Sequence, residues 1–70
     1  MLNEWNSFRF DLWLYNEMRK RGWNTQDLAE KAGITRQAVV FYLADERLPT
    51  MRTLAEILSA FDMHMEFVDN

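Results

Sequence analysis

Residues 22–44, GWNTQDLAEKAGITRQAVVFYLA, carry the local signals of two short helices joined by a tight turn. Asn24 can cap the first helix, and Asp27, three residues later, can complete a capping box with it. Gly33 can adopt the left-handed conformation in which many helices end. Thr35 then offers the cap of a second helix, which fills the rest of the stretch. The sequence therefore predicts one short helix on each side of a turn at Gly33.

Two further helices are predicted, one on each side of this stretch. Ser7 can cap a helix that runs to Arg21 and ends at Gly22. Thr50, directly after the only proline, can begin another helix, in which apolar residues recur at helical spacing. Its apolar face consists of Met51, Leu54, Ile57, Leu58 and Phe61. No repeat or flexible linker interrupts the chain, so we expect one all-α domain over residues 1–70, with four to five short helices.

The end of the chain alternates between apolar and polar side chains, which is the pattern of a short β-strand over about residues 63–68. The apolar side of this strand consists of Met63, Met65 and Phe67. A lone strand cannot satisfy its backbone hydrogen-bonding groups, so we expect it to pair with the same strand of a second copy, with these three residues at the dimer interface. Trp13, on the polar side of the first helix, offers two alternatives: packing under Trp5, or a contact between subunits.

The formal net charge of −3 argues at first against nucleic acid, because duplex DNA repels acidic surfaces. However, residues 19–52 hold seven of the eight Lys and Arg side chains against four acids, which gives this segment a local charge of +3. The seven are Arg19, Lys20, Arg21, Lys31, Arg36, Arg47 and Arg52. The remaining acids gather in the flanks, so charge is segregated along the chain as a basic binding face requires.

Cysteine is absent, which excludes disulfides and thiolate metal sites and fits a reducing cytoplasm. The first residues lack the pattern of a signal peptide, and no apolar run is long enough to span a bilayer. We therefore expect a cytoplasmic protein without a membrane partner.

Residues suited to catalysis or metal binding are poorly represented. His64 is the only histidine, and no cysteine, aspartate or second histidine stands at ligand spacing from it. The sequence shows neither a nucleophile with its base nor a glycine-rich phosphate loop. We expect no metal, no cofactor and no enzymatic activity.

Residues 22–39, together with three later pieces of the sequence, match the residue pattern of a known protein family. The later pieces are Tyr42-Leu43, Arg47-Leu48-Pro49-Thr50 and Thr53-Leu54. Over roughly residues 8–62 the chain resembles the lambda-repressor-like (XRE-type) helix-turn-helix family, in particular its short antitoxin-like or Cro-like members, with the helix-turn-helix at about residues 24–44. The resemblance implies that the two helices of the motif are clasped together by Leu28, Ala29, Gly33, Val39 and Tyr42.

The second helix of such a motif enters the major groove of DNA with its N-terminal end. Arg36 and Gln37 occupy that end, and their side chains suit guanine and adenine respectively. The resemblance places base-contacting residues at these two positions and at Phe41, beside which Val40 can also meet thymine methyl groups. The predicted phosphate contacts are Thr25, Gln26, Arg47 and Arg52. The family often carries glutamine in place of Thr25, and its absence here leaves Thr25 or Gln26 as the substitute.

The outer face of the second helix departs further from the family, because Val40, Phe41 and Ala44 make it largely apolar. Thymine methyl groups, a second copy or another protein, such as a cognate toxin, could cover it. The sequence favours a sequence-specific regulator that binds double-stranded DNA as a homodimer and represses by occupying its operator. The alternative is an antitoxin or another protein-interaction module with weak or no DNA binding.

Overall fold

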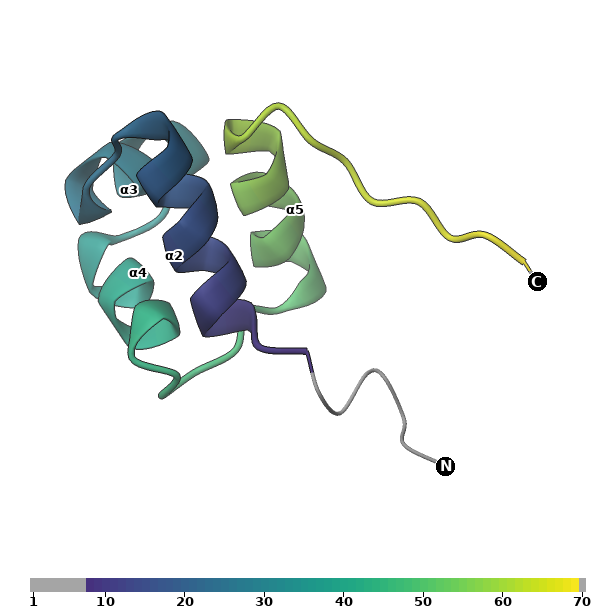
Figure 1. Cartoon of the computed structure of the whole chain (residues 1–70), viewed down its shortest axis with the longest axis horizontal. Coiled ribbons are helices and arrows are strands. Elements are labelled where there is room, and N and C mark those ends of the chain that lie inside the picture. The colour runs from purple at the N-terminus through teal and green to yellow at the C-terminus, as the bar shows by residue number, and fades with distance from the viewer. Residues whose placement is uncertain (1–7, 70) are drawn as a thin grey trace.

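The structure is a computed structural model that describes residues 8–69. Within this range the chain forms four α-helices. They are α2 (Phe10–Arg21), α3 (Thr25–Ala32), α4 (Arg36–Leu43) and α5 (Met51–Ala60). Helix α3 packs against both α4 and α5, and α2 packs against α4 (Figure 1). The prediction of an all-α helix-turn-helix bundle is confirmed, with α3 and α4 as the two helices of the motif.

Local capping explains why α3 and α4 begin and end where they do. The Asn24 side chain accepts a hydrogen bond from the Asp27 amide, and the Asp27 carboxylate accepts one from the Asn24 amide, both at 2.9 Å. This is the predicted capping box. Gly33 ends α3 in the left-handed conformation, with φ at 70°. The Thr35 hydroxyl then accepts the Ala38 amide at 3.1 Å and starts α4. These predictions of caps and turn are confirmed.

The core takes one completely buried aliphatic side chain from each helix. These four side chains are Leu14, Leu28, Val39 and Ile57. Phe61, just after α5, and Tyr42 of α4 are buried around them. Because every helix contributes to the same cluster, the relative positions of α3 and α4 depend on the whole bundle rather than on their short turn alone.

Trp13 lies at the edge of this core instead of projecting from a polar face. It is half-buried, and its ring centroid is 5.7 Å from that of Phe10 and 5.9 Å from that of Phe61. Trp23 stacks on Phe61 as well, at 5.3 Å. Trp5, the packing partner expected from the sequence, lies outside the described residues. A contact of Trp13 with a second subunit stays a prediction.

Helix α2 begins later than expected. The predicted cap, Ser7, lies outside the described residues, and the helix starts at Phe10 with Arg9 in the N-cap position and no side-chain cap. The Arg9 guanidinium instead makes two hydrogen bonds to the Asp11 carboxylate, at 2.8 and 3.1 Å. The charge-assisted hydrogen bond lowers the pKa of Asp11, because it favours the ionised carboxylate.

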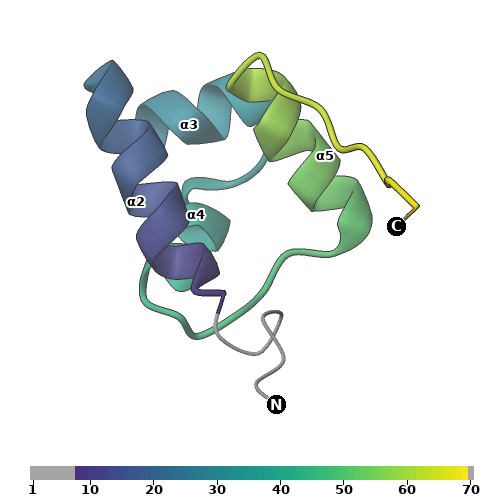
Figure 2. The same ribbon diagram turned by 45° about the vertical axis from the view of Figure 1, so that its right-hand side comes forward.

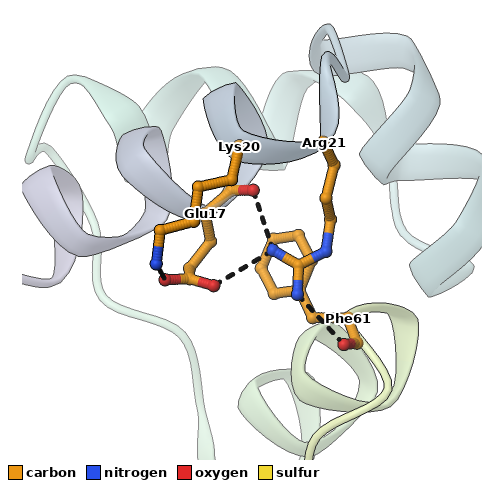
Figure 3. Close-up of polar contacts among 4 residues, drawn as sticks. All are labelled: Glu17, Lys20, Arg21 and Phe61. Carbon is orange, nitrogen blue, oxygen red and sulfur yellow. Dashed lines mark hydrogen bonds and ion pairs between the residues drawn. The ribbon is translucent and has the colours of Figure 1, made fainter.

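A buried acid, Glu17, holds Arg21, and Arg21 links the C-terminal ends of α2 and α5 (Figure 3). Glu17 accepts hydrogen bonds at 3.0 Å from Lys20 Nζ on one carboxylate oxygen and from Arg21 Nη1 on the other. Arg21 Nη2 also donates to the Phe61 carbonyl at 3.2 Å, and the guanidinium lies 4.4 Å from the centre of the Phe61 ring. The hydrogen bonds from Lys20 and Arg21 hold the pKa of the Glu17 carboxyl below its usual range. Sequence reasoning treated these two cations only as part of a basic segment.

The predicted C-terminal strand is wrong. No residue of the described range 8–69 is in a strand, and after α5 the chain turns and continues as an irregular segment that leaves the bundle (Figures 1 and 2). An alternation of side chains reports only that an extended chain would have two faces, whereas a strand also needs a hydrogen-bonded neighbour. The expected pairing of Met63, Met65 and Phe67 across a dimer therefore loses its basis. None of the helices within this range is long and apolar enough to cross a membrane.

Candidate nucleic-acid interface

Helix α4 separates an inward face from an outward face. Val39 is completely buried and Tyr42 nearly so, which fixes the rotation of the helix against α2 and α3. Arg36 and Gln37, in the first turn, are exposed. Within residues 8–69, neither side chain has a hydrogen bond or an ion pair. The first turn of α4 thus offers one guanidinium and one amide whose donors and acceptors are free for a ligand.

The apolar part of the outer face lies one turn further along α4. Val40 and Phe41 are half-buried, and Ala44 is exposed. The Arg47 guanidinium lies over the Phe41 ring, 4.7 Å from its centre, in a cation–π arrangement. The structure therefore brings together two residues that the sequence had assigned to different tasks, base reading for Phe41 and phosphate binding for Arg47. Their contact depends on the path of the chain after α4, which helical periodicity does not reveal.

The other predicted phosphate contacts differ in how free they are. Thr25 is the first residue of α3 and is half-buried. The Gln26 side chain is exposed but donates a hydrogen bond to Glu30 Oε1 at 3.0 Å. The Arg52 side chain is 91% exposed and lies 3.6 Å from Glu56 Oε1 across one turn of α5. An exposed ion pair of this kind is weak, so Arg52 can exchange its partner for a phosphate at little cost.

A concavity of about 400 Å³ adjoins the N-terminal end of α3. Its wall includes Asn24 and Thr25 from this helix start, Arg19 from α2 and Leu43 from α4. Arg19 is exposed and has no side-chain partner within the described residues. Sequence reasoning missed this placement, because it counted Arg19 among the cations of segment 19–52 and assigned it no contact. The one available signal is the short connection at Gly22, which brings the end of α2 close to the start of α3 in the chain.

Most of the basic residues of segment 19–52 already contact another side chain. Lys20 and Arg21 are paired with Glu17, and Arg52 with Glu56. Lys31 and Arg47 lie over aromatic rings, those of Trp23 and Phe41. In the part of the chain that the structure describes, Arg19 and Arg36 are the two cations of this segment without such a partner. The local charge of +3 therefore overstates the number of cations that are free to bind one ligand.

His64, the histidine of the chain, lies after α5 with its Nε2 3.0 Å from Glu66 Oε1. Within residues 8–69 no three His, Asp or Glu side chains are grouped closely enough to hold a metal ion.

Comparison with known proteins identifies the family. A model of the family described as "Helix-turn-helix" matches residues 14–68, which include α3, α4 and α5. A search among curated proteins and a search among solved structures each found no match. The matched region covers most of the chain, and it holds the capped helix pair and the clasping residues described above. The chain belongs to the lambda-repressor-like, XRE-type helix-turn-helix family of DNA-binding regulators.

Proposed function

We propose that this protein is a sequence-specific DNA-binding transcriptional repressor that occupies its operator as a homodimer. One observation carries the proposal: on the first turn of α4, Arg36 and Gln37 are exposed and have no side-chain hydrogen bond or ion pair to any other residue in the range 8–69. The Thr35 cap and the buried Val39 and Tyr42 hold that turn in place. A free arginine and glutamine at the leading end of a recognition helix are what base reading requires.

Arg36 and Gln37 read base edges in the major groove. Arginine can donate to both O6 and N7 of guanine, and glutamine can bond both N6 and N7 of adenine. Each such pair discriminates against the wrong base by about 1–3 kcal/mol. Val40 and Phe41, one turn further along, supply apolar contacts to thymine methyl groups, with Arg47 bound over the Phe41 ring.

Phosphate contacts flank this reading surface. The free amide groups at the start of α3 and the Thr25 hydroxyl bind a phosphate, and Arg19, which lines the same concavity as Asn24 and Thr25, adds a cation. Arg52 and Arg47, beyond α4, contact the backbone on the other side. In many family members a glutamine at the position of Thr25 braces both a phosphate and the recognition helix. Here Gln26 takes that role, after its side chain gives up the hydrogen bond to Glu30. These contacts position the protein but carry no sequence information.

Two copies place two α4 helices in successive major grooves, about 34 Å apart, on a pseudo-palindromic operator. Occupancy of that site then blocks access of RNA polymerase. Sedimentation of the protein alone and with operator DNA tests the dimer, because two copies per duplex are expected and a single copy at saturation contradicts it.

Selection of bound sites from random duplex DNA provides the operator and tests the proposal. In fluorescence anisotropy with that operator, Arg36→Ala and Gln37→Ala should each weaken binding about tenfold or more and relax the base preference at one position. Arg52→Ala is the matched control: it should weaken binding to all sequences alike and leave base preference unchanged. Selection that recovers no common site, or an Arg36→Ala variant with unchanged affinity, rejects the proposal.

A second candidate function has support from the apolar outer face of α4, which holds Val40, Phe41 and Ala44. Such a face suits a protein partner, as in an antitoxin that holds its toxin and binds DNA weakly or not at all. The product of the neighbouring reading frame is the partner to test. If Phe41→Ser abolishes that complex while Arg36→Ala has no effect on any DNA binding, this second function replaces the first.

A further inference from the structure

A second concavity lies on another side of the bundle, between α2, α5 and the segment that follows α5. Its volume is about 660 Å³, and its walls are mostly apolar. Phe10 and Trp13 of α2, Met51 and Leu58 of α5, and Met65 and Phe67 of the C-terminal segment line it. We call it the α2–α5 groove. Figure 1 shows the C-terminal segment leaving the end of α5 on the side away from α4, and no residue of α4 lines the groove. The groove is therefore separate from the proposed DNA-reading helix.

The α2–α5 groove concentrates apolar side chains that are left in water. Phe67 is 85% exposed and Val68 77%, and Met51 and Phe8 are each more than half exposed. All four line this groove. Exposed apolar area costs about 25 cal/mol per Å², and a continuous patch of it on a small protein marks an interaction surface. The groove therefore has the composition of a site for a partner with apolar side chains.

The charged side chains of the groove all have the same sign. Glu66 and Asp69 line it, and no Lys or Arg does so. The one side-chain contact of Glu66 within residues 8–69 is with His64. Asp69 has none in that range. A partner that covers the apolar floor consequently meets two carboxylates at the rim, and cations beside its apolar residues would be attracted to them.

We propose that the α2–α5 groove binds a basic amphipathic helix of a partner protein. The apolar side chains of that helix, spaced at i, i+3, i+4 and i+7, fill the groove, and its Lys or Arg side chains face Glu66 and Asp69. A second copy of this chain fits less well. The symmetric contact of two identical grooves would bring four carboxylates together without cations. The proposal goes beyond DNA binding, because it assigns a separate face that can be occupied while α4 is on DNA.

A fluorescein-labelled helical peptide of about fourteen leucine and lysine residues, with leucines at the spacing given above, is the probe. Its fluorescence anisotropy is measured with the full chain in the absence of DNA. The control peptide keeps every leucine and replaces each lysine with glutamate. The lysine peptide should bind at least about tenfold more tightly than the glutamate peptide, and salt should narrow this difference.

Variants of the protein separate groove binding from general attraction to an acidic chain. Met51→Ser and Phe67→Ser should each weaken binding of the lysine peptide about tenfold or more, whereas Leu12→Ser, at an exposed leucine outside the groove, should not. The double variant Glu66→Lys, Asp69→Lys should reverse the preference in favour of the glutamate peptide. The double variant Glu30→Lys, Glu46→Lys changes net charge equally but lies outside the groove, and it should keep the original preference.

Four results overturn the proposal. Two of them are equal binding of the two peptides, and binding of the lysine peptide that Met51→Ser and Phe67→Ser leave unchanged. Another is a dimer in sedimentation that Phe67→Ser converts to monomer, because a second copy then occupies the groove. The last is peptide binding that occurs only after Trp5→Ser, since the groove would then belong to the chain's own N-terminal residues. None of these outcomes affects the operator-binding test, so the two proposals fail independently.

Discussion

Glu17 is a buried acid that stays charged because two cations donate hydrogen bonds to it. Its folded pKa lies below the ordinary value of 4.5, and that of Asp11 lies below 3.8 for the same kind of reason. A carboxyl with a lowered folded pKa stabilises the fold fully above its unfolded pKa and loses this contribution as pH falls through the folded pKa. Urea unfolding at a series of pH values should therefore show constant stability down to about pH 4.5 and a decline below it.

Replacement of Glu17 tests its part in this decline. Glu17→Gln leaves Lys20 and Arg21 without a charged acceptor, so it should lower the free energy of unfolding at pH 7 by about 1–2 kcal/mol. It should also make the decline below pH 4.5 shallower. Glu46→Gln, at an exposed acid after α4, serves as the control and should change neither quantity. A Glu17→Gln variant with wild-type stability and pH dependence would show that the charge of the Glu17 carboxylate in Figure 3 contributes nothing to folding.

Which site residues the sequence could predict depends on whether their placement is local. The exposure of Arg36 and Gln37 follows from helical periodicity once Val39 and Tyr42 are taken as inward. The contact of Arg47 with Phe41, and the place of Arg19 beside the start of α3, depend on how separate segments meet. Periodicity within one helix carries no information about such contacts.

Two helices have equivalent threonine caps, but only one of these helices carries the proposed base-reading residues. A comparison of the two caps can therefore test the role of α4. Thr35 caps α4 and Thr50 caps α5 in the same way, each hydroxyl accepting the amide three residues ahead. Thr35→Ala and Thr50→Ala should each cost about 1 kcal/mol of stability, measured by urea unfolding. We expect Thr35→Ala to weaken operator binding as well, because it loosens the turn that carries Arg36.

Comparison of the two alanine variants separates the effect of the cap on the orientation of Arg36 from its effect on stability. Thr50→Ala should bind the operator with nearly wild-type affinity at a temperature where both variants are folded. Thr35→Ser keeps the capping hydroxyl and should restore binding. Equal loss of operator affinity in the two alanine variants would mean that the cap of α4 has no special part in base reading.

The turn between α3 and α4 depends on a backbone conformation rather than on space. Gly33 has φ at +70°, and a Cβ added there would meet nothing within 4 Å. Gly33→Ala should therefore destabilise the protein by about 1–2 kcal/mol through backbone strain alone, and Gly33→Asn by less, because asparagine tolerates this conformation better. Thermal unfolding of the two variants measures the difference. A Gly33→Ala variant as stable as the wild type would contradict the assigned conformation.

Elements with local signals were the ones that sequence reasoning predicted correctly. The caps at Asn24 and Thr35 and the glycine turns form their hydrogen bonds with groups only a few residues away. Their pattern can therefore be seen in the sequence. The C-terminal strand was wrong because its alternation says nothing about a hydrogen-bonded neighbour. The start of α2 at Phe10 was missed since its first turn has no side-chain cap, only the Arg9 and Asp11 pair.

At the scale of the whole molecule, the fold redistributes the charge that the sequence groups together. A count along the chain gives segment 19–52 a charge of +3, yet most of its cations already contact acids or aromatic rings. A net-negative protein can then bind DNA only if a few free cations face the duplex together. Arg19 and Lys20 are adjacent in the sequence but differ in this respect, because Lys20 is paired with Glu17 and Arg19 borders the start of α3.

The salt dependence of operator binding should distinguish these two neighbours. Arg19→Ala and Lys20→Ala change the net charge equally, so general repulsion between protein and DNA increases by the same amount in both. Only Arg19→Ala should remove a phosphate contact. The plot of log affinity against log salt concentration should then fall less steeply, by about 0.9 in slope, and binding at low salt should weaken. Anisotropy titrations over a range of NaCl concentrations measure both slopes. Equal slopes for the two variants would show that Arg19 contacts no phosphate, and that the concavity at the start of α3 faces away from the DNA.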